Sequence, residues 1–405
     1  MLPRTFSTKI YTSDEICHSY DARQQALTSP DGSLSPSGRL WDEVLEVAGD
    51  EATLIHYLAM HGAHLITVES CAADNGIPWL SPGQATPAPP LRARGMVGPL
   101  PRQNSSESPE SQGWYLGALH VSCGSGHGNQ AESSAKTSHE GPRSDDGGTL
   151  ALWQTLLEQA KHLAQAAGGT QLVSPLSLSS WFPYRLRLDD EPLAYPWEPQ
   201  RLEGLDKAYE AAGFLSLECY RSVGSSGLQA FAQRIRKPYE EARGKGFTFS
   251  SLAAMPDQAK ALRRLWEICQ DAFRKSPYFA PISFEDFVAF YLAKIPSKDS
   301  SSAPWGRRET LCISPSGEIA GFILGYCVEK ELVFKSMAID RPFQGHRLGD
   351  AVLYPMAAEA VGLGIDNYVS ALVLSGNKSE FVFRNSTTRW EHRYGMFGCE
   401  LNQRV

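Results

Sequence analysis

The segment from Glu331 to Gly364 contains the residues whose types and spacing are best suited to chemistry. Residues 331–339 are apolar and rich in branched and aromatic side chains, which predicts a strand. After it comes a short glycine-bounded loop, Gln344, Gly345, His346, Arg347, Leu348 and Gly349. From Asp350 the apolar residues recur at helical spacing. A strand that runs through a glycine loop into a helix start predicts an anion site, because the loop amides and the helix N-terminus point at the same place.

Three kinds of anion site use this geometry, and two of them do not fit. A Walker loop needs a Gly-Lys-Ser/Thr end, and a Rossmann fingerprint needs three glycines in the GxGxxG register; the loop has neither. The third kind is the pyrophosphate loop of the GNAT acyltransferase superfamily, (Gln/Arg)-x-x-Gly-x-(Gly/Ala). Gln344, Gly345 and Gly349 resemble it, whereas Arg347 stands where that family usually has glycine.

The order of predicted elements around the loop also resembles the GNAT fold. A hairpin is predicted over residues 309–327, then the strand, the loop and the helix, a further strand over 368–374, a turn and helix cap at 375–379, and a last strand near 393–398. The resemblance covers about residues 247–401. It implies an α/β (α+β) fold, a mixed and mostly antiparallel sheet flanked by helices.

The resemblance also implies a co-substrate and residues that bind it. Acetyl-CoA or another acyl-CoA would lie along the strand, whose backbone pairs with pantetheine as an added strand would. The residues implied on that basis are Met337, Ala338 and Ile339 of the strand, the loop residues 344–349, and Asn377 beyond the next strand. No metal is expected.

Catalysis in this family consists mostly of positioning, with one proton taken from the amine and one returned to the thiolate. The implied base is a glutamate on or beside the strand, here Glu331 or Glu329. Lys335 lies within an apolar strand and needs a partner or an exposed face, and an acceptor carboxylate or a carrier phosphate are both options. The family's usual acid, a tyrosine after the asparagine, is absent, which leaves Tyr326 or His392 as substitutes, or a thiolate that leaves unassisted.

The length of 405 residues predicts two domains. We expect an N-terminal extension over 1–48 and a diverged GNAT-like lobe over 49–224. The lobe would contain low-complexity insertions at 79–112 and 124–148, and a charged linker at 225–246 would join it to the acyltransferase domain at 247–405. The first lobe repeats a strand, helix and strand order but has no second glycine loop. It is therefore expected to lack a cofactor, and an unrelated α/β domain is the alternative.

The composition limits the classes of partner that we expect the protein to bind. The net charge of −7 gives no basic footprint, so nucleic acid is not expected. No apolar run is long enough to span a membrane, and the N-terminus has no apolar signal core. The eight cysteines form no CxxC pair, which indicates neither a zinc site nor a disulfide framework and favours a cytoplasmic protein.

The predicted function is acyl transfer from acyl-CoA, or from an acyl carrier protein, to the amine of a small molecule or amino acid. Secondary metabolism is one context for this reaction. Two alternatives stay open. One is a catalytically degenerate protein that binds an acyl thioester, and the other is a GNAT-like thioester decarboxylase or S-acyltransferase. Arg347 and the missing tyrosine favour the alternatives, whereas the strand, the glycines and Asn377 favour acyl transfer to an amine.

Overall fold

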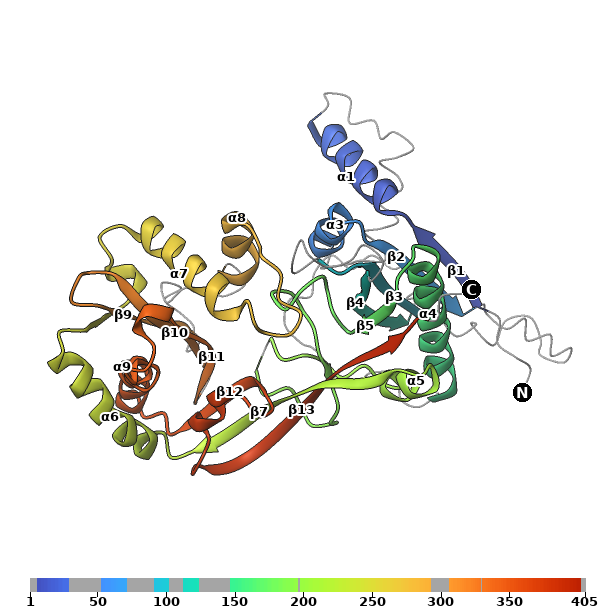
Figure 1. Cartoon of the computed structure of the whole chain (residues 1–405). Helices are drawn as coiled ribbons and strands as arrows, with labels where there is room; N and C mark the ends of the chain where they lie inside the picture. The colour runs from blue at the N-terminus through green and yellow to red at the C-terminus, as the bar shows by residue number, and fades with distance from the viewer. Residues whose placement is uncertain are drawn as a thin grey trace, which may run out of the picture. The chain divides into compact units, whose positions relative to one another are not determined.

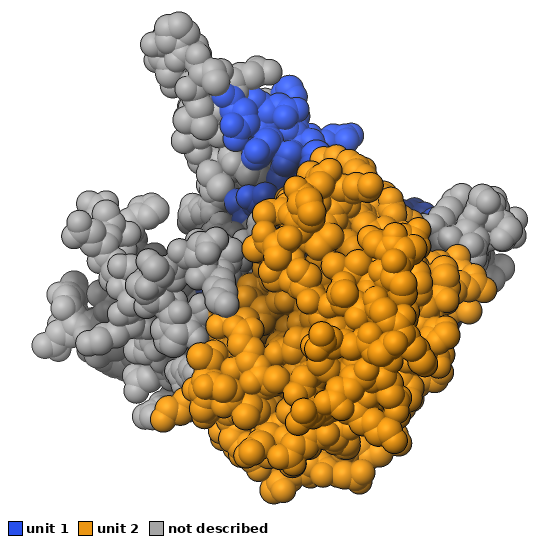
Figure 2. Space-filling model, turned by 90° about the vertical axis from the view of Figure 1, so that its left-hand side faces the viewer, with its two compact units in different colours: residues 1–186, 199–217, 396–405 blue, residues 187–198, 218–395 orange. Residues whose placement is uncertain are grey.

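The computed structural model describes residues 6–28, 52–70, 91–101, 112–123, 146–195, 197–292, 306–328 and 330–401. The chain forms two compact units, each assembled from separate chain segments (Figure 2). Unit 1 comprises residues 1–186, 199–217 and 396–405, and unit 2 comprises residues 187–198 and 218–395. The fold is α/β, with a mixed, mostly antiparallel sheet flanked by helices, as the sequence predicts.

The sheet of unit 1 has six strands among the described residues, in the spatial order β1 (Phe6–Tyr11), β2 (His64–Ser70), β3 (Leu91–Pro99), β4 (Gly113–Cys123), β5 (Gln171–Ser174) and the C-terminal end of β13 (Thr387–Glu400). Neighbouring strands are antiparallel, except β4 and β5. The helices are α1 (Ser13–Thr28), α3 (Ala52–Met60), α4 (Asp146–Ala166) and α5 (Leu205–Ala211). Helix α4 packs against β2 and β3.

Two expectations for unit 1 are corrected. The N-terminal extension is not separate, because β1 pairs with β2; its side chains are mostly exposed, so no hydrophobic alternation marks the strand. The low-complexity insertion at 79–112 contains β3, a buried strand. Its glycines reflect close packing rather than a loop, since a Cβ at Gly95 would lie 2.8 Å from Leu119 Cδ2. The insertion predicted at 124–148 lies almost entirely outside the described residues.

Unit 2 has the spatial strand order β7 (Leu215–Ser226), β12 (Asn367–Leu374), β11 (Glu331–Ile339), β10 (Ile319–Val328), β9 (Gly306–Ile313) and β8 (Thr248–Ser250), with the first part of β13 beside β7. The two-residue strand β6 (Leu186–Arg187) pairs with β13. The helices are α6 (Leu228–Gly244), α7 (Gln258–Phe273), α8 (Phe284–Asp286) and α9 (Leu348–Gly362), with the short turns η2 (Leu252–Ala254), η3 (Phe287–Leu292), η4 (Arg341–Phe343) and η5 (Lys378–Val382).

Helices cover both faces of the β9–β11 sheet (Figure 1). One face, here the α9 face, packs Ile323, Leu332 and Phe334 against α9 and α6. The opposite face, here the α7 face, contacts α7. The segment 225–246 is therefore not a solvated linker, because α6 buries Leu228 and Phe231 in this core while its charged side chains point outward. Among the described residues, no helix is long and apolar enough to cross a membrane.

Candidate functional site

The parallel strands β11 and β12 pair over only part of their length. Register partners run from Glu331 opposite Asn367 to Phe334 opposite Ser370. Beyond Ser370, β12 shifts register and continues along β7 instead, with Val373 opposite Arg221. Within the described residues the second half of β11 therefore has β10 on one side and no paired strand on the other. This open edge is where an extended ligand can pair with the strand.

A β-bulge marks the point where the two strands part. Phe334 lies opposite Gly325 of β10 and Ser336 lies opposite Leu324, so Lys335 is the extra residue between them. A bulge bends its strand and re-aims the side chains beside it. The predicted co-substrate residues follow: Ala338 is buried, and Met337 and Ile339 are half-buried and pack on the α9 face.

The glycine loop follows the open edge. Its amides from Gly345 to Gly349 make no hydrogen bond within the described part of the chain. Gly345 has φ 86° and Arg347 has φ 57°, so Arg347 adopts the left-handed conformation that glycine takes more easily. Helix α9 begins at Leu348, two residues earlier than predicted. The loop therefore presents consecutive unbonded N–H groups at a helix N-terminus, a site for an anion.

Leu348 is buried in the core at the start of α9, whereas the other side chains of the loop lie in solvent or brace the loop itself. The side-chain amide of Gln344 donates to the Ile339 carbonyl at 3.0 Å, and Arg347 forms a 3.0 Å ion pair with Asp350. His346 is exposed. Asn377 is also exposed, and its Oδ1 accepts from the Ser379 amide at 2.9 Å at the start of η5. Ligand contact with these residues stays a prediction.

The predicted catalytic residues are not gathered in one place. Glu331 is half-buried at the start of β11, where it accepts a hydrogen bond from the Arg389 guanidinium. Alternation along β11 places it on the α7 face, because Leu332 and Phe334 face α9. Glu329 lies outside the described residues. His392, on β13, is buried within a polar network described below.

The α7 face carries a small cavity that the sequence did not predict. It is shallow and partly open to solvent, and it is lined by Leu252, Leu265, Phe287, Arg307, Glu309, Phe322 and Leu324. Its two charged residues, Arg307 and Glu309, form an ion pair at 3.3 Å. The lining is mostly apolar, and this ion pair is its charged part.

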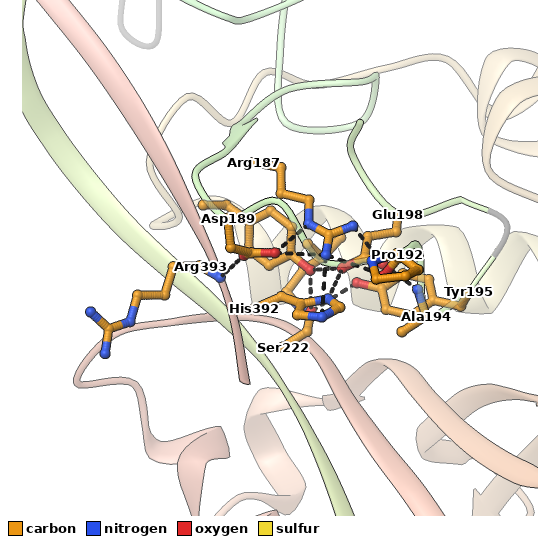
Figure 3. Close-up of polar contacts among 11 residues, drawn as sticks. Arg187, Asp189, Pro192, Ala194, Tyr195, Glu198, Ser222, His392 and Arg393 are labelled. Atoms are coloured by element: carbon orange, nitrogen blue, oxygen red, sulfur yellow. Dashed lines mark hydrogen bonds and ion pairs between the residues drawn. The ribbon is translucent and has the colours of Figure 1, made fainter. Parts of the chain in front are cut away.

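A buried polar network lies near β7 and β13 (Figure 3). Glu198 has no exposed side-chain surface, and its carboxylate accepts from His392 Nδ1 at 2.7 Å, from the Ala194 amide at 2.6 Å and from Tyr394 Oη. The Arg187 guanidinium lies 3.7 Å from the same carboxylate. A buried carboxylate is tolerated when its oxygens are hydrogen-bonded and its charge is paired, as here.

The hydrogen-bond partners of His392 determine which of its ring nitrogens carries the hydrogen. Its Nε2 lies 3.2 Å from Arg187 Nη2, and an arginine can only donate, so Nε2 accepts and Nδ1 carries the hydrogen. Both ring nitrogens are thus engaged inside the protein. We therefore propose that His392 positions its neighbours and does not exchange protons with a substrate. The nearby Asp189 is partly buried, which alone would raise its pKa, but hydrogen bonds from Arg187 and the Arg393 amide hold that pKa below its usual range.

The network reaches the strand β12 through one hydroxyl. Ser222 Oγ lies 2.8 Å from Tyr195 Oη and 3.1 Å from Tyr394 Oη, and it accepts from the Leu372 amide at 2.9 Å. Leu372 has φ 55° and belongs to the stretch where β12 leaves β11. The network therefore holds the bend of β12 that keeps the edge of β11 open. Sequence reasoning missed Arg187, Glu198 and Ser222; an acid inside an aromatic and proline-rich segment was the available signal.

Unit 1 contains a similar pair of parallel strands, β4 and β5, but the following chain segment occupies the edge where the two strands part. β4 and β5 pair over three positions, ending at Tyr115 opposite Val173. The chain after β5 then lies on β4: Leu176 donates to the Leu116 carbonyl at 2.9 Å. A Cβ at Gly117 would lie 2.1 Å from the Leu176 carbonyl oxygen, so only glycine fits there. The backbone groups that could pair with a ligand in unit 1 are thus already used.

No protein-family model and no curated protein matches this chain. Solved structures similar to it over nearly its whole length are GNAT N-acetyltransferases. A GCN5-related N-acetyltransferase from Sphaerobacter thermophilus is 14% identical, with 99% of this chain and 98% of that chain covered and a TM-score of 0.42. A tandem GNAT protein from the clavulanic acid biosynthesis pathway is 13% identical, with 98% and 99% covered and a TM-score of 0.43. A GCN5-related N-acetyltransferase from Kribbella flavida is 11% identical, with 98% and 71% covered and a TM-score of 0.42. At TM-scores below 0.5 we draw no conclusion about activity from these likenesses, and the proposals below rest on the residues of this chain.

Proposed function

We propose that unit 2 is an acyltransferase that binds an acyl thioester of CoA, or of a carrier protein, and passes the acyl group to a small amine. One observation carries the proposal: the edge of β11 opens at Lys335 and leads directly into a loop of unbonded amides at the start of α9. A pantetheine arm has amides that pair with a strand edge, and it ends in a phosphate. The open edge and the loop follow one another in the order that such an arm needs.

The chemistry requires little beyond positioning. The amine nitrogen attacks the acyl carbon, the N–C bond forms, and the C–S bond breaks with its electron pair on sulfur. One proton leaves the amine and one reaches the thiolate. Holding the two reactants together supplies most of the acceleration, and a carboxylate on the α7 face, Glu331 or Glu309, is placed to take the amine proton through bound water.

Replacing Gly349 with valine tests the loop. A Cβ there meets only Met337, 3.7 Å from its Cε, so the fold accepts the side chain, yet the valine would stand where a phosphate approaches the amides. We expect the affinity for acetyl-CoA to fall at least about tenfold, or roughly 1.4 kcal/mol. Titration calorimetry with CoA, acetyl-CoA and an acyl carrier protein measures this loss of affinity. It also shows whether the chain binds an acyl group carried by CoA or by a carrier protein.

Gly362→Val is the matched control. Gly362 is the last residue of α9 and has no atom within 4 Å of an added Cβ, so it imposes the same change in helix propensity far from the loop. This variant should bind like the wild type. If Gly349→Val also binds like the wild type, the loop is not the phosphate site. If no thioester binds to the wild type, the proposed function is wrong.

The filled opening in unit 1 predicts one thioester site per chain. Leu116 O and Ala118 N of β4 are bonded to Leu176 and to the Ser177 hydroxyl, so a pantetheine arm would have to displace them. Titration of the full chain should therefore give one acetyl-CoA per chain, and Gly349→Val should weaken that single site. Two sites of similar affinity would contradict the expectation.

A further inference from the structure

Two buried hydrogen-bond donors on unit 2 have no acceptor within the described part of the chain. They are Tyr326 Oη on β10 and Trp197 Nε1. Their rings are in contact, with centroids 4.4 Å apart, and Tyr326 is only 3% exposed. Buried polar groups are rarely left without a partner, because each such group costs stability. Two such donors side by side indicate that a ligand atom completes them.

A positive charge lies beside the two rings. The ammonium group of Lys335 is 5.9 Å from the ring centroid of Trp197 and 5.9 Å from that of Tyr326. The indole N–H and the ammonium can only donate hydrogen bonds, so their common partner must accept them. Arg307 and Glu309, the charged groups that act on Tyr326, form an ion pair with each other. The chemistry of the three side chains fits an anionic oxygen, and a carboxylate offers several acceptor positions.

We propose that Tyr326, Trp197 and Lys335 bind a carboxylate of the acyl acceptor, so that the acceptor is an amino acid or another small amine that carries a carboxylate. The proposal rests on the acyl transfer proposed above and names the substrate class of the same site. We call these three side chains the donor cluster.

The position of the donor cluster supports this assignment. Lys335 is the bulge residue at which the edge of β11 opens, so the donor cluster lies at the start of the edge that would hold the thioester. Alternation along β10 places Tyr326 on the α7 face together with Phe322 and Leu324, which line the cavity. A carboxylate held there leaves the amine of a small amino acid close to the open edge, where it can attack the acyl carbon.

The experiment compares each common L-amino acid with its carboxamide, which keeps the amine but removes the charge. Binding is measured by calorimetry without CoA, and turnover is measured by thiol release with acetyl-CoA. We expect the wild type to bind and acylate at least one amino acid at least about tenfold better than its carboxamide. Tyr326→Phe and Lys335→Gln should each weaken amino-acid binding and raise its KM about tenfold or more, with acetyl-CoA affinity unchanged.

A stability measurement separates binding from folding. Since Tyr326 Oη has no hydrogen-bond partner among the described residues, Tyr326→Phe should melt at or above the temperature of the unliganded wild type. The matched controls are Tyr115→Phe, which removes a buried hydroxyl in unit 1 that likewise has no partner in the described ranges, and Lys330→Gln, which removes an exposed lysine. Both should keep wild-type binding.

The outcomes decide the two proposals separately. The donor cluster is overturned if no amino acid binds, if amino acids and carboxamides bind equally, or if Tyr326→Phe and Lys335→Gln keep wild-type affinity. A chain that binds amino acids through the donor cluster but does not bind acetyl-CoA would refute the acyl transfer and leave the carboxylate site standing.

Discussion

Glu198→Ala is expected to lower the free energy of unfolding by about 3–5 kcal/mol, the usual cost of removing one partner from a buried charge network. The variant removes the fully buried carboxylate beside the Arg187 guanidinium, which is 2% exposed and keeps only the partly exposed Asp189 as a counterion. It also removes the acceptor of His392 Nδ1, and it leaves Tyr394 Oη with Ser222 alone. Chemical denaturation of the full chain at neutral pH measures the loss. Glu198→Gln should lose less of the free energy of unfolding, because the amide oxygen of the glutamine still accepts hydrogen bonds.

Glu241→Ala is a suitable control, since this exposed residue of α6 makes only a long 3.9 Å ion pair with Lys237 and should change stability little. A further variant, Ser222→Ala, removes the contact to the Leu372 amide without removing a charge. Because this contact holds the bend of β12, Ser222→Ala should weaken acetyl-CoA binding even under conditions where the variant is fully folded. A Glu198→Ala variant as stable as the wild type would show that the network does not hold the fold.

Glu331→Gln is expected to lower turnover by about 10²-fold at neutral pH, the low end of what a general base contributes. The carboxylate is fixed on the α7 face by Arg389, and it would take the amine proton through water. At neutral pH an aliphatic amine is mostly protonated, so the base is needed. As the pH rises the amine loses its own proton, and the deficit of the variant should shrink. Initial rates of thiol release across this pH range measure both effects.

Glu309→Gln is the matched comparison, because Glu309 is also a half-buried and ion-paired carboxylate on the α7 face. It should keep most of the wild-type turnover if Glu331 is the base. A loss seen only in Glu309→Gln would reassign the base to the residue in the cavity. Thioester affinity should be unchanged in both variants, since neither side chain lies near the loop of α9.

Local patterns predicted those elements whose apolar residues form a continuous run or recur at helical spacing. The strand predicted over 331–339 matches β11 to the residue. The start of α9 was placed two residues late, because the left-handed Arg347 sets the cap and no sequence rule expects that conformation of arginine. The strand β3 was missed because its glycines serve close packing, which only the neighbouring strands reveal.

The candidate site was predictable only where its residues are neighbours in sequence. The loop at 344–349 follows the strand directly, so its place in the fold could be foreseen. Glu198 and His392 are brought together by the fold, as are Trp197 and Tyr326, and neither pair has a shared local motif. Tyr326 was considered as an acid only to replace a missing tyrosine. That its hydroxyl has no hydrogen-bond partner among the described residues is visible only in three dimensions.

The last strand constrains the order in which the chain folds on the ribosome. Phe397–Glu400 of β13 pairs with Gln171–Ser174 of β5 inside unit 1, and these residues are synthesised long after the rest of that sheet. Domains usually fold as they emerge, N-terminal part first. Here the nascent unit 1 carries β5 as an open edge until Phe397–Glu400 has been translated, and open edges are templates for pairing with other chains. Because each unit is assembled from separate chain segments, neither unit can be produced alone by a single cut in the gene.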